Sequence, residues 1–295
     1  MSSFEKTLRE KYSPETIQAV KKYNLIDDIL FTKAAEDKKF CEEILRTILD
    51  DQELVVVRNT PQAKLQNLKG RSVVFDALCR LKGGAMIDIE VQKTNNDDHL
   101  KRVRYNGSAL TANITKTGTK FCKVPNVIII FISKFDIFKD GYALYHVDKI
   151  VRETSKKIED GLDEIYVNSA VKDGSKVSEL MELFVDLKAY NKDEFPVVSE
   201  TKKIYKETEE GVQTMCEITE RLYKKGEKKG RARGFAEGEA SGIAKGEARG
   251  ETKGILFTLK NMMRNLGLTA DKALDVCEVP TNERAFYLEK LKEVK

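Results

Sequence analysis

The chain has 295 residues, of which 41% are hydrophobic and 34% are charged, and its formal net charge is +4. This length allows one large domain with an appendage, or two modest domains. The longest strongly apolar run, "VIIIFI" at 127–132, is far shorter than the roughly 20 residues that span a bilayer, which excludes a membrane-spanning protein.

The start of the chain, "MSSFEKTLREKY", lacks the apolar centre of a secretory signal, so we expect a cytoplasmic protein with no membrane contact. Five scattered cysteines without a CxxC pair argue against a disulfide framework or a thiolate zinc site, and two histidines are too few for a multi-histidine centre. A metal would be held by carboxylates and carbonyls, which favours magnesium or manganese.

The elements expected in chain order begin with helices. "SPETIQAV" has Ser13 as an N-cap and Pro14 at the first helical position, and "DKKFCEEILRTIL" carries apolar residues at helical spacing. Strand-forming residues follow at 53–58, 71–81 and 84–93, with "KGG" as a hairpin turn between the last two.

The next segment, "DHLKRVRYNGSALTANI", is typical of a helix, and "NVIIIFIS" of a fully buried strand. "YALYHVDKI" and "DEIYVNS" indicate a second hairpin, and "KVSELMELFVDLKAY" another helix. This order predicts a mixed α/β sheet flanked by helices. We expect the main domain to cover 1–195 and a helical connector to cover 196–225.

Glycine then recurs at every fourth position from Gly226 to Gly254. Glycines at this spacing could let two stable helices pair closely over 226–254. Each interior glycine costs a helix about 1 kcal/mol relative to alanine, which favours a marginal, partner-dependent helix or a flexible basic linker instead. Residues 224–254 hold nine Lys/Arg and five Glu, so the net charge of +4 lies in this segment, as a solvated linker or as a contact for phosphates.

Residues 255–295 predict a small helical unit with Thr269 as a cap. Its spacing is loosely that of a DNA-reading helix-turn-helix, but helical hairpins with no role in DNA binding look similar. Two copies of the chain could associate through these C-terminal helices.

The stretch "AMIDIEVQK" at 85–93 alternates, with Asp88, Glu90 and Gln92 on one face. Asp76, on the preceding strand, could lie about 5 Å from Glu90 across the hairpin. Two such carboxylates repel each other unless a cation lies between them. Asp76, Glu90 and the Val91 carbonyl could then bind magnesium, with Gln92 holding a water against a phosphate. The alternative is an ordinary hairpin with a solvated face.

Three segments together resemble the Rpn family of recombination-promoting nucleases and transposases, within the PD-(D/E)XK superfamily. These are the hairpin, the upstream "DDILFTKAAED" and the downstream "LKRVRYNGSALTANITKTG…NVIIIFISKFDIF". The resemblance covers roughly residues 24–190. It implies a restriction-endonuclease-like α/β fold with a helical C-terminal tail, and a metal-dependent DNA endonuclease that promotes recombination or transposition.

The resemblance also implies roles for single residues. The metal-binding acids match Asp76 and Glu90, and Gln92 stands where the superfamily has lysine, so the charge that lysine supplies is missing. Asp28, in a D-x-x-F pattern with Phe31, matches an acid of the opening helix. The alternative is an N-cap at Asp28 and a core aromatic at Phe31, and both could coexist with a role at the metal. The positions that match the basic and aromatic stretch of the helix after the hairpin are Arg102, Arg104 and Tyr105, which would contact DNA phosphates or form a solvated helix face. Lys93 is a further candidate for DNA contact, although strand alternation points it to the other face.

The cofactor implied is magnesium, which manganese could replace. Two other functions remain open on the sequence: a non-catalytic DNA-binding or oligomerisation protein that keeps the fold, and a nuclease directed at RNA.

Overall fold

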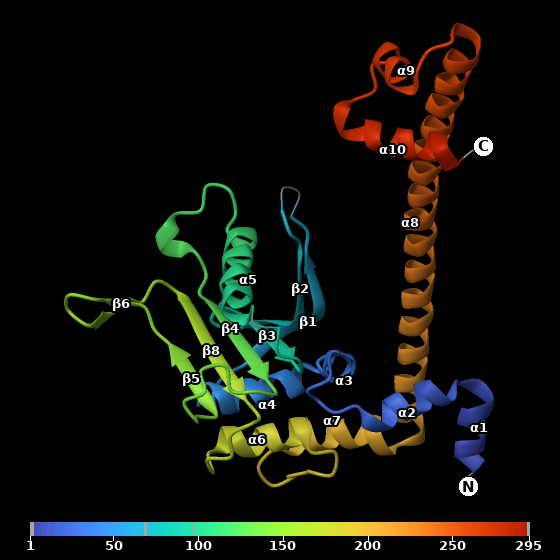
Figure 1. The fold of residues 1–295 in the computed structure, drawn as a ribbon. Coiled ribbons are helices and arrows are strands. Elements are labelled where there is room, and N and C mark those ends of the chain that lie inside the picture. The colour runs from blue at the N-terminus through green and yellow to red at the C-terminus, as the bar shows by residue number, and fades with distance from the viewer. Residues whose placement is uncertain (1–2, 68–69, 97, 294–295) are drawn as a thin grey trace. The chain divides into compact units, whose positions relative to one another are not determined.

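The computed structural model describes residues 3–67, 70–96 and 98–293. The chain divides into two compact units, Met1–Leu222 and Tyr223–Lys295. Among the described helices, none combines the length and the apolar character that crossing a membrane requires. The first unit is built on a mixed six-stranded sheet with helices on both faces, as the sequence predicts (Figure 1).

The strand order in this sheet is β1-β2-β3-β4-β8-β5. The first three strands form an antiparallel meander, β4 and β8 continue parallel to β3, and β5 closes the edge antiparallel to β8. The bounds are β1 Val56–Leu65, β2 Val73–Leu81, β3 Met86–Gln92, β4 Val127–Ser133, β5 Leu144–Val147 and β8 Leu162–Asn168, and a separate ribbon pairs β6 Ile150–Val151 with β7 Lys156–Lys157.

The central strand β4 lies between two parallel neighbours and is covered on both faces, which explains its uninterrupted apolar sequence. Its parallel pairing with β3 requires a crossover, which is supplied by helix α5, His99–Ile114. Figure 1 shows α5 on one face of the sheet and α4 on the other. Two apolar clusters, one under each face, make up the core of this unit.

The helices of the face opposite α5 pack against the larger cluster. They are α1 Ser3–Lys11, α2 Pro14–Lys22, α3 Asp28–Ala34, α4 Lys38–Ile48, α6 Lys176–Val185 and α7 Pro196–Glu207. The predicted cap at Ser13 is present, since its hydroxyl accepts a hydrogen bond of 3.1 Å from the Thr16 N–H. A short 3-10 turn, η1 Phe121–Lys123, lies in the loop between α5 and β4.

The residues of 196–222 other than Thr208 are helical, and they pack into the first unit. Phe195, Val198, Met215 and Cys216 are buried in the larger apolar cluster. The hydroxyl of Thr16 donates a hydrogen bond of 2.6 Å to Glu220. The compact unit therefore continues past residue 195 and includes the start of the next helix.

A fully buried lysine joins α7 to α6. The Lys202 ammonium donates hydrogen bonds to the carbonyls of Leu183, Asp186 and Ala189, at 2.8, 2.5 and 3.0 Å. These carbonyls lie at the end of α6 and just beyond it, where helical partners are lacking. Burial lowers the pKa of Lys202 to about 8. The group is a helix cap, and it lies outside the acidic site described below.

Helix α8, Glu209–Leu266, runs for 58 residues and carries the whole glycine repeat. The prediction of a flexible linker over 226–254 is wrong. Good helix formers lie between the glycines, and Arg231 and Arg233 make i,i+4 ion pairs with Glu227 and Glu237 at 2.8 and 2.6 Å. Apart from the adjacent backbone of α8 itself, a Cβ added at any of the eight glycines would meet no described residue within 4 Å.

The second unit has its own small apolar cluster, which includes Leu259, Leu274 and Tyr287. The end of α8 contributes to it together with α9 Ala270–Val276 and α10 Thr281–Glu293. Thr269 caps α9 as predicted, accepting a hydrogen bond from the Lys272 N–H at 3.4 Å.

Candidate active site

The acidic site forms where β2 and β3 stop pairing. Paired residues run from Arg80–Met86 to Ala77–Ile89. One position further along, the carboxylate of Asp76 accepts a hydrogen bond of 2.9 Å from the Val91 N–H. The Asp76 carboxylate thus takes the place of a β2 carbonyl as the acceptor for the Val91 N–H. This bond holds Asp76 against β3, beside Glu90.

Two further carboxyl groups lie on the β3 face that α5 covers. Asp88 is completely buried and Glu90 is 7% exposed, so the interpretation of this face as solvated is wrong. Asn106 of α5 donates a hydrogen bond of 3.3 Å to Asp88. Within the described residues, one oxygen of each carboxyl group, Asp88 Oδ1 and Glu90 Oε1, has no hydrogen-bond partner.

Burial and mutual repulsion hold these carboxyls toward their protonated forms. Burial, followed by the charge of Asp76, raises the pKa of Glu90 to about 8. Burial raises the pKa of Asp76 to about 7, and Asp28 adds to the shift. The pKa of Asp88 lies well above its usual value because of burial and the nearby Glu90. Such a group of acids is the electrostatic environment that a divalent cation relieves.

Asp28 reaches the same site through a residue that the sequence did not single out. The amide of Gln62 donates hydrogen bonds to Asp28 at 3.1 Å and to Asp76 at 3.4 Å. Gln62 lies in β1 with φ of 49°, a left-handed conformation unusual for its residue type. No sequence pattern marks that conformation.

Asp28 is the first residue of α3, and the N-cap position belongs to Asp27. The alternative that Asp28 is an N-cap is therefore wrong. Phe31 is a fully buried core aromatic that packs against Phe40 and Phe184. A core role for Phe31 coexists with the contact of Asp28 to the acidic site.

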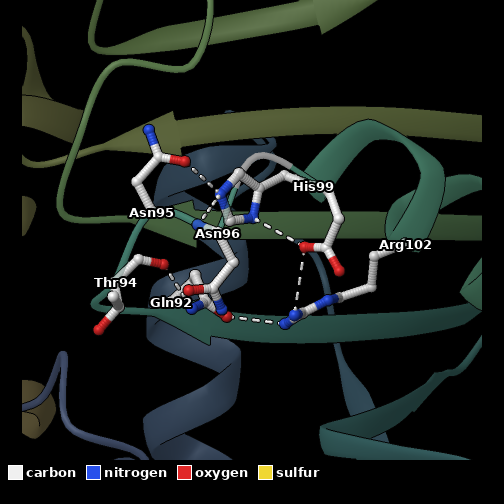
Figure 2. Close-up of polar contacts among 7 residues, drawn as sticks. Gln92, Thr94, Asn95, Asn96, His99 and Arg102 are labelled. Carbon is white, nitrogen blue, oxygen red and sulfur yellow. Dashed lines mark hydrogen bonds and ion pairs between the residues drawn. The ribbon is translucent and has the colours of Figure 1, made fainter. Parts of the chain in front are cut away.

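Gln92, at the end of β3, is held at both ends of its amide (Figure 2). Its Nε2 donates a hydrogen bond of 2.6 Å to the Thr94 carbonyl, and its Oε1 accepts one of 2.7 Å from the Arg102 guanidinium. Arg102 also pairs with Asp98, one turn earlier, at 3.4 Å. The result is a fixed cation beside the acids, and its charge acts to lower the pKa of both Asp76 and Glu90.

The loop before α5 is fixed by His99, which is buried between the rings of Phe131 and Phe135. Its Nε2 accepts a hydrogen bond of 3.2 Å from the Asn96 N–H, as Figure 2 shows. The first turn of α5, and with it Arg102, is thereby placed against the end of β3.

Lys93 lies just past the end of β3, and its ammonium is 2.6 Å from Asp27. A cavity of about 560 Å³ is lined by both cations and by the acids. Its polar lining residues include Asp28, Asp76, Glu90, Gln92, Lys93 and Arg102. The structure therefore brings together side chains that the strand alternation alone would divide between two faces.

The other two predicted DNA contacts on α5, Arg104 and Tyr105, lie in different places. Arg102 and Tyr105, three residues apart, line a neighbouring cavity with Glu90, and the Tyr105 hydroxyl donates to the Arg71 carbonyl. Arg104 projects elsewhere on the helix and lines neither cavity. A contact of Arg104 with DNA stays a prediction.

The donor set fits a hard divalent cation. Asp76 and Glu90 provide carboxylate oxygens, one buried oxygen of Glu90 lacks a hydrogen-bond partner, and the backbone at Val91 passes beside them. Oxygen ligands of this kind suit magnesium or manganese. Among the described residues there is no group of three or more His, Cys, Asp or Glu side chains placed to hold a metal. Protein ligation would accordingly be sparse, as is usual for magnesium.

One protein-family model matches residues 28–232, and its family is described as the PD-(D/E)XK nuclease family transposases. This match covers more than half of the chain and contains Asp28, Asp76 and Glu90. No curated protein and no solved structure matches the chain significantly. The fold, the acidic site and the match agree, and the chain belongs to the PD-(D/E)XK nuclease family of transposases.

Proposed function

We propose that this protein is a metal-dependent DNA endonuclease that hydrolyses phosphodiester bonds and promotes recombination or transposition. The observation that carries the proposal is the meeting of Asp76 and Glu90, with raised pKa values, in one cavity with the cations Lys93 and Arg102. Buried acids beside fixed cations are typical of a catalytic site rather than of a binding surface alone.

Asp76, Glu90 and the Val91 carbonyl would hold magnesium, or manganese in its place. When bound, the ion would supply a Lewis acid for the phosphate and would favour deprotonation of the attacking water. Neighbouring groups of the protein hold the acidic side chains in position. The Val91 N–H fixes Asp76, and Gln62 ties Asp28 to the same carboxylate.

Arg102 provides the positive charge that glutamine at position 92 cannot. Gln92 and Asp98 hold the guanidinium beside the acids, where it can donate to a phosphate oxygen. Lys93 is a second cation in the same cavity, tied to Asp27. Binding of the substrate phosphate between these cations would place the scissile bond next to Asp76 and Glu90.

The test is incubation of the purified full chain with supercoiled plasmid in magnesium, in manganese or in EDTA, with a single-stranded RNA in parallel. We expect nicked or linear plasmid with either metal and intact plasmid in EDTA. Intact plasmid under all three conditions would contradict the proposal, and cleavage confined to RNA would change its substrate.

A further inference from the structure

A second cavity, of about 570 Å³, lies on the first unit away from the acidic site. It is bounded by β1, β2, the start of β3, the end of α5 and the loop that follows α5. The residues that matter for its chemistry are Arg58, Arg80, Lys116 and Lys123, with Leu78 and Met86 as an apolar floor.

Strand register places this cavity relative to the acidic site. Arg58 pairs with Arg80, and Arg80 pairs with Met86, so the three side chains form one row across three strands. Met86 shares its face of β3 with Asp88 and Glu90. Met86 and Glu90 are four positions apart on β3, which corresponds to about 13 Å at the usual rise of a strand. The basic cavity and the acids thus lie on one face of the sheet, near opposite ends of α5.

The four cations of this cavity are free for a ligand. Within residues 3–67, 70–96 and 98–293, none of their side chains takes part in a hydrogen bond or an ion pair, whereas Lys93 and Arg102 at the acidic site are both paired. None of the described residues that line the cavity is acidic. Four uncompensated positive charges around one hollow would repel one another, and a polyanion would relieve that repulsion.

An exposed aromatic ring lies in the same loop as two of these cations, Lys116 and Lys123. Phe121, in the turn η1, is 91% exposed. It lies two residues from Thr119 and two from Lys123, both of which line the cavity. A large apolar ring held in solvent next to lysines is the combination on which single-stranded nucleic acids bind, with bases stacked on the ring and phosphates on the cations.

We propose that this cavity binds an unpaired strand of nucleic acid, with phosphates on Arg58, Arg80, Lys116 and Lys123 and a base stacked on Phe121. The inference rests on the proposed function and deepens it, because it gives the nuclease a second contact with its substrate, about 13 Å from Glu90 along β3.

The experiment measures binding of the full chain to a labelled oligo-dT strand by fluorescence anisotropy, in EDTA and over a series of salt concentrations. The variants are Arg58→Gln/Arg80→Gln, Lys116→Gln/Lys123→Gln and Phe121→Ala. The control is Lys38→Gln/Lys203→Gln, which removes two exposed lysines of α4 and α7 and leaves the cavity intact. All of the substituted side chains are exposed, and circular dichroism checks that each variant folds.

Each double variant in the cavity should lose about tenfold in affinity and should flatten the salt slope by about 1.4, since each lost phosphate contact with a single strand contributes about 0.7. Phe121→Ala should lose about tenfold with an unchanged salt slope, because stacking releases no counterions. The salt slope of the control variant should stay closer to the wild-type value than the slopes of the two double variants in the cavity.

Slopes and affinities that match the control in both double variants would overturn the inference. If one double variant fails to fold, the other decides. Displacement of the strand by free thymidine monophosphate as efficiently as by unlabelled strand would also overturn it, because the cavity would then be a nucleotide site. Cleavage is scored separately on plasmid. Cavity-dependent binding without cleavage would contradict the proposed function alone, and cleavage with unchanged binding in the variants would contradict this inference alone.

Discussion

The side-chain carbonyl of Gln92 accepts a hydrogen bond of 2.7 Å from the guanidinium of Arg102. One residue ends a strand and the other lies in the first turns of the helix that crosses over the sheet. This contact places a permanent positive charge beside Asp76 and Glu90. Gln92 is therefore a positioning residue for Arg102 in this structure, in addition to any direct contact with substrate that its position allows.

Replacing either main acid should abolish cleavage. Asp76→Ala or Glu90→Ala removes a carboxylate from the proposed metal site, so plasmid should stay supercoiled in magnesium and in manganese. The fold should persist, because loss of one buried acid relieves repulsion within the cluster. Thermal denaturation checks stability, and wild-type cutting by either variant would show that the site is assigned incorrectly.

Gln92→Leu should reduce the cleavage rate on the order of a hundredfold, the effect typical of one positioned hydrogen-bonding group. Leucine is similar in size but leaves Arg102 without its carbonyl partner. Asp88→Asn is the matched control on the same face. It should keep activity, because Asn106 can still bond to the amide and repulsion with Glu90 falls. A time course in which Asp88→Asn is inactive and Gln92→Leu is normal would reverse these roles.

Gln92→Lys tests whether Arg102 supplies the charge that lysine gives elsewhere in the superfamily. Lysine at this position would face the guanidinium at close range, so the single variant should lose activity or stability through repulsion between like charges. The double variant Gln92→Lys/Arg102→Gln restores one cation and one amide, and it should recover most of the cleavage rate. Equal activity of the single and double variants would show that the two positions are independent.

The metal-free protein should lose stability as the pH rises from about 5 to about 8. Folding raises the pKa of Asp76 to about 7 and that of Glu90 to about 8, whereas unfolded carboxyls titrate near about 4. The folded state therefore binds more protons in this range, and its advantage disappears as these protons leave. Glu90→Gln should flatten the pH dependence of the melting temperature, and magnesium should raise that temperature more at pH 8 than at pH 6. A flat wild-type profile in EDTA would refute this.

The basic charge of the glycine repeat should contribute to DNA binding. Residues 224–254 carry the net charge of +4, and their side chains in α8 are exposed. Truncation after Tyr223 leaves the first unit whole and should weaken binding to duplex DNA and flatten its salt dependence, because fewer counterions are released. Salt titration of binding checks this. An unchanged slope would show that the segment is a spacer, and association of two copies through it stays a prediction.

The strands of the sheet and the shared face of Asp88 and Glu90 follow from local periodicity. The roles of Asp76 and Glu90 as metal-binding acids come from the family resemblance and stay predictions. Alternation in 85–93 places Glu90 correctly, but it cannot tell whether a helix covers that face, and α5 does cover it. The role of Gln62 depends on its left-handed backbone conformation, and the neighbouring residues do not predict that conformation.

Contacts between residues far apart in the sequence are also beyond what local patterns predict. The contact of Arg102 with Gln92 spans ten residues and a turn in the chain, so spacing within either element does not show it. Burial of Met215 and Cys216 extends the first unit beyond residue 195 because distant helices cover them. Helix propensity alone left a marginal helix and a flexible linker open for the glycine repeat, and the structure forms one continuous helix there, with i,i+4 ion pairs between the glycines.

The contacts that close the first unit join the two ends of a long stretch of chain. Thr16 bonds to Glu220, and Tyr12 bonds to Glu217, across 204 and 205 residues. During synthesis on the ribosome, α1 and α2 emerge before the rest of this unit, and nearly all of it must follow before their partners exist. Until then their apolar faces stay open to chaperones or to other nascent chains. A product that ends before Met215 would therefore have an unclosed core and be exposed to proteolysis.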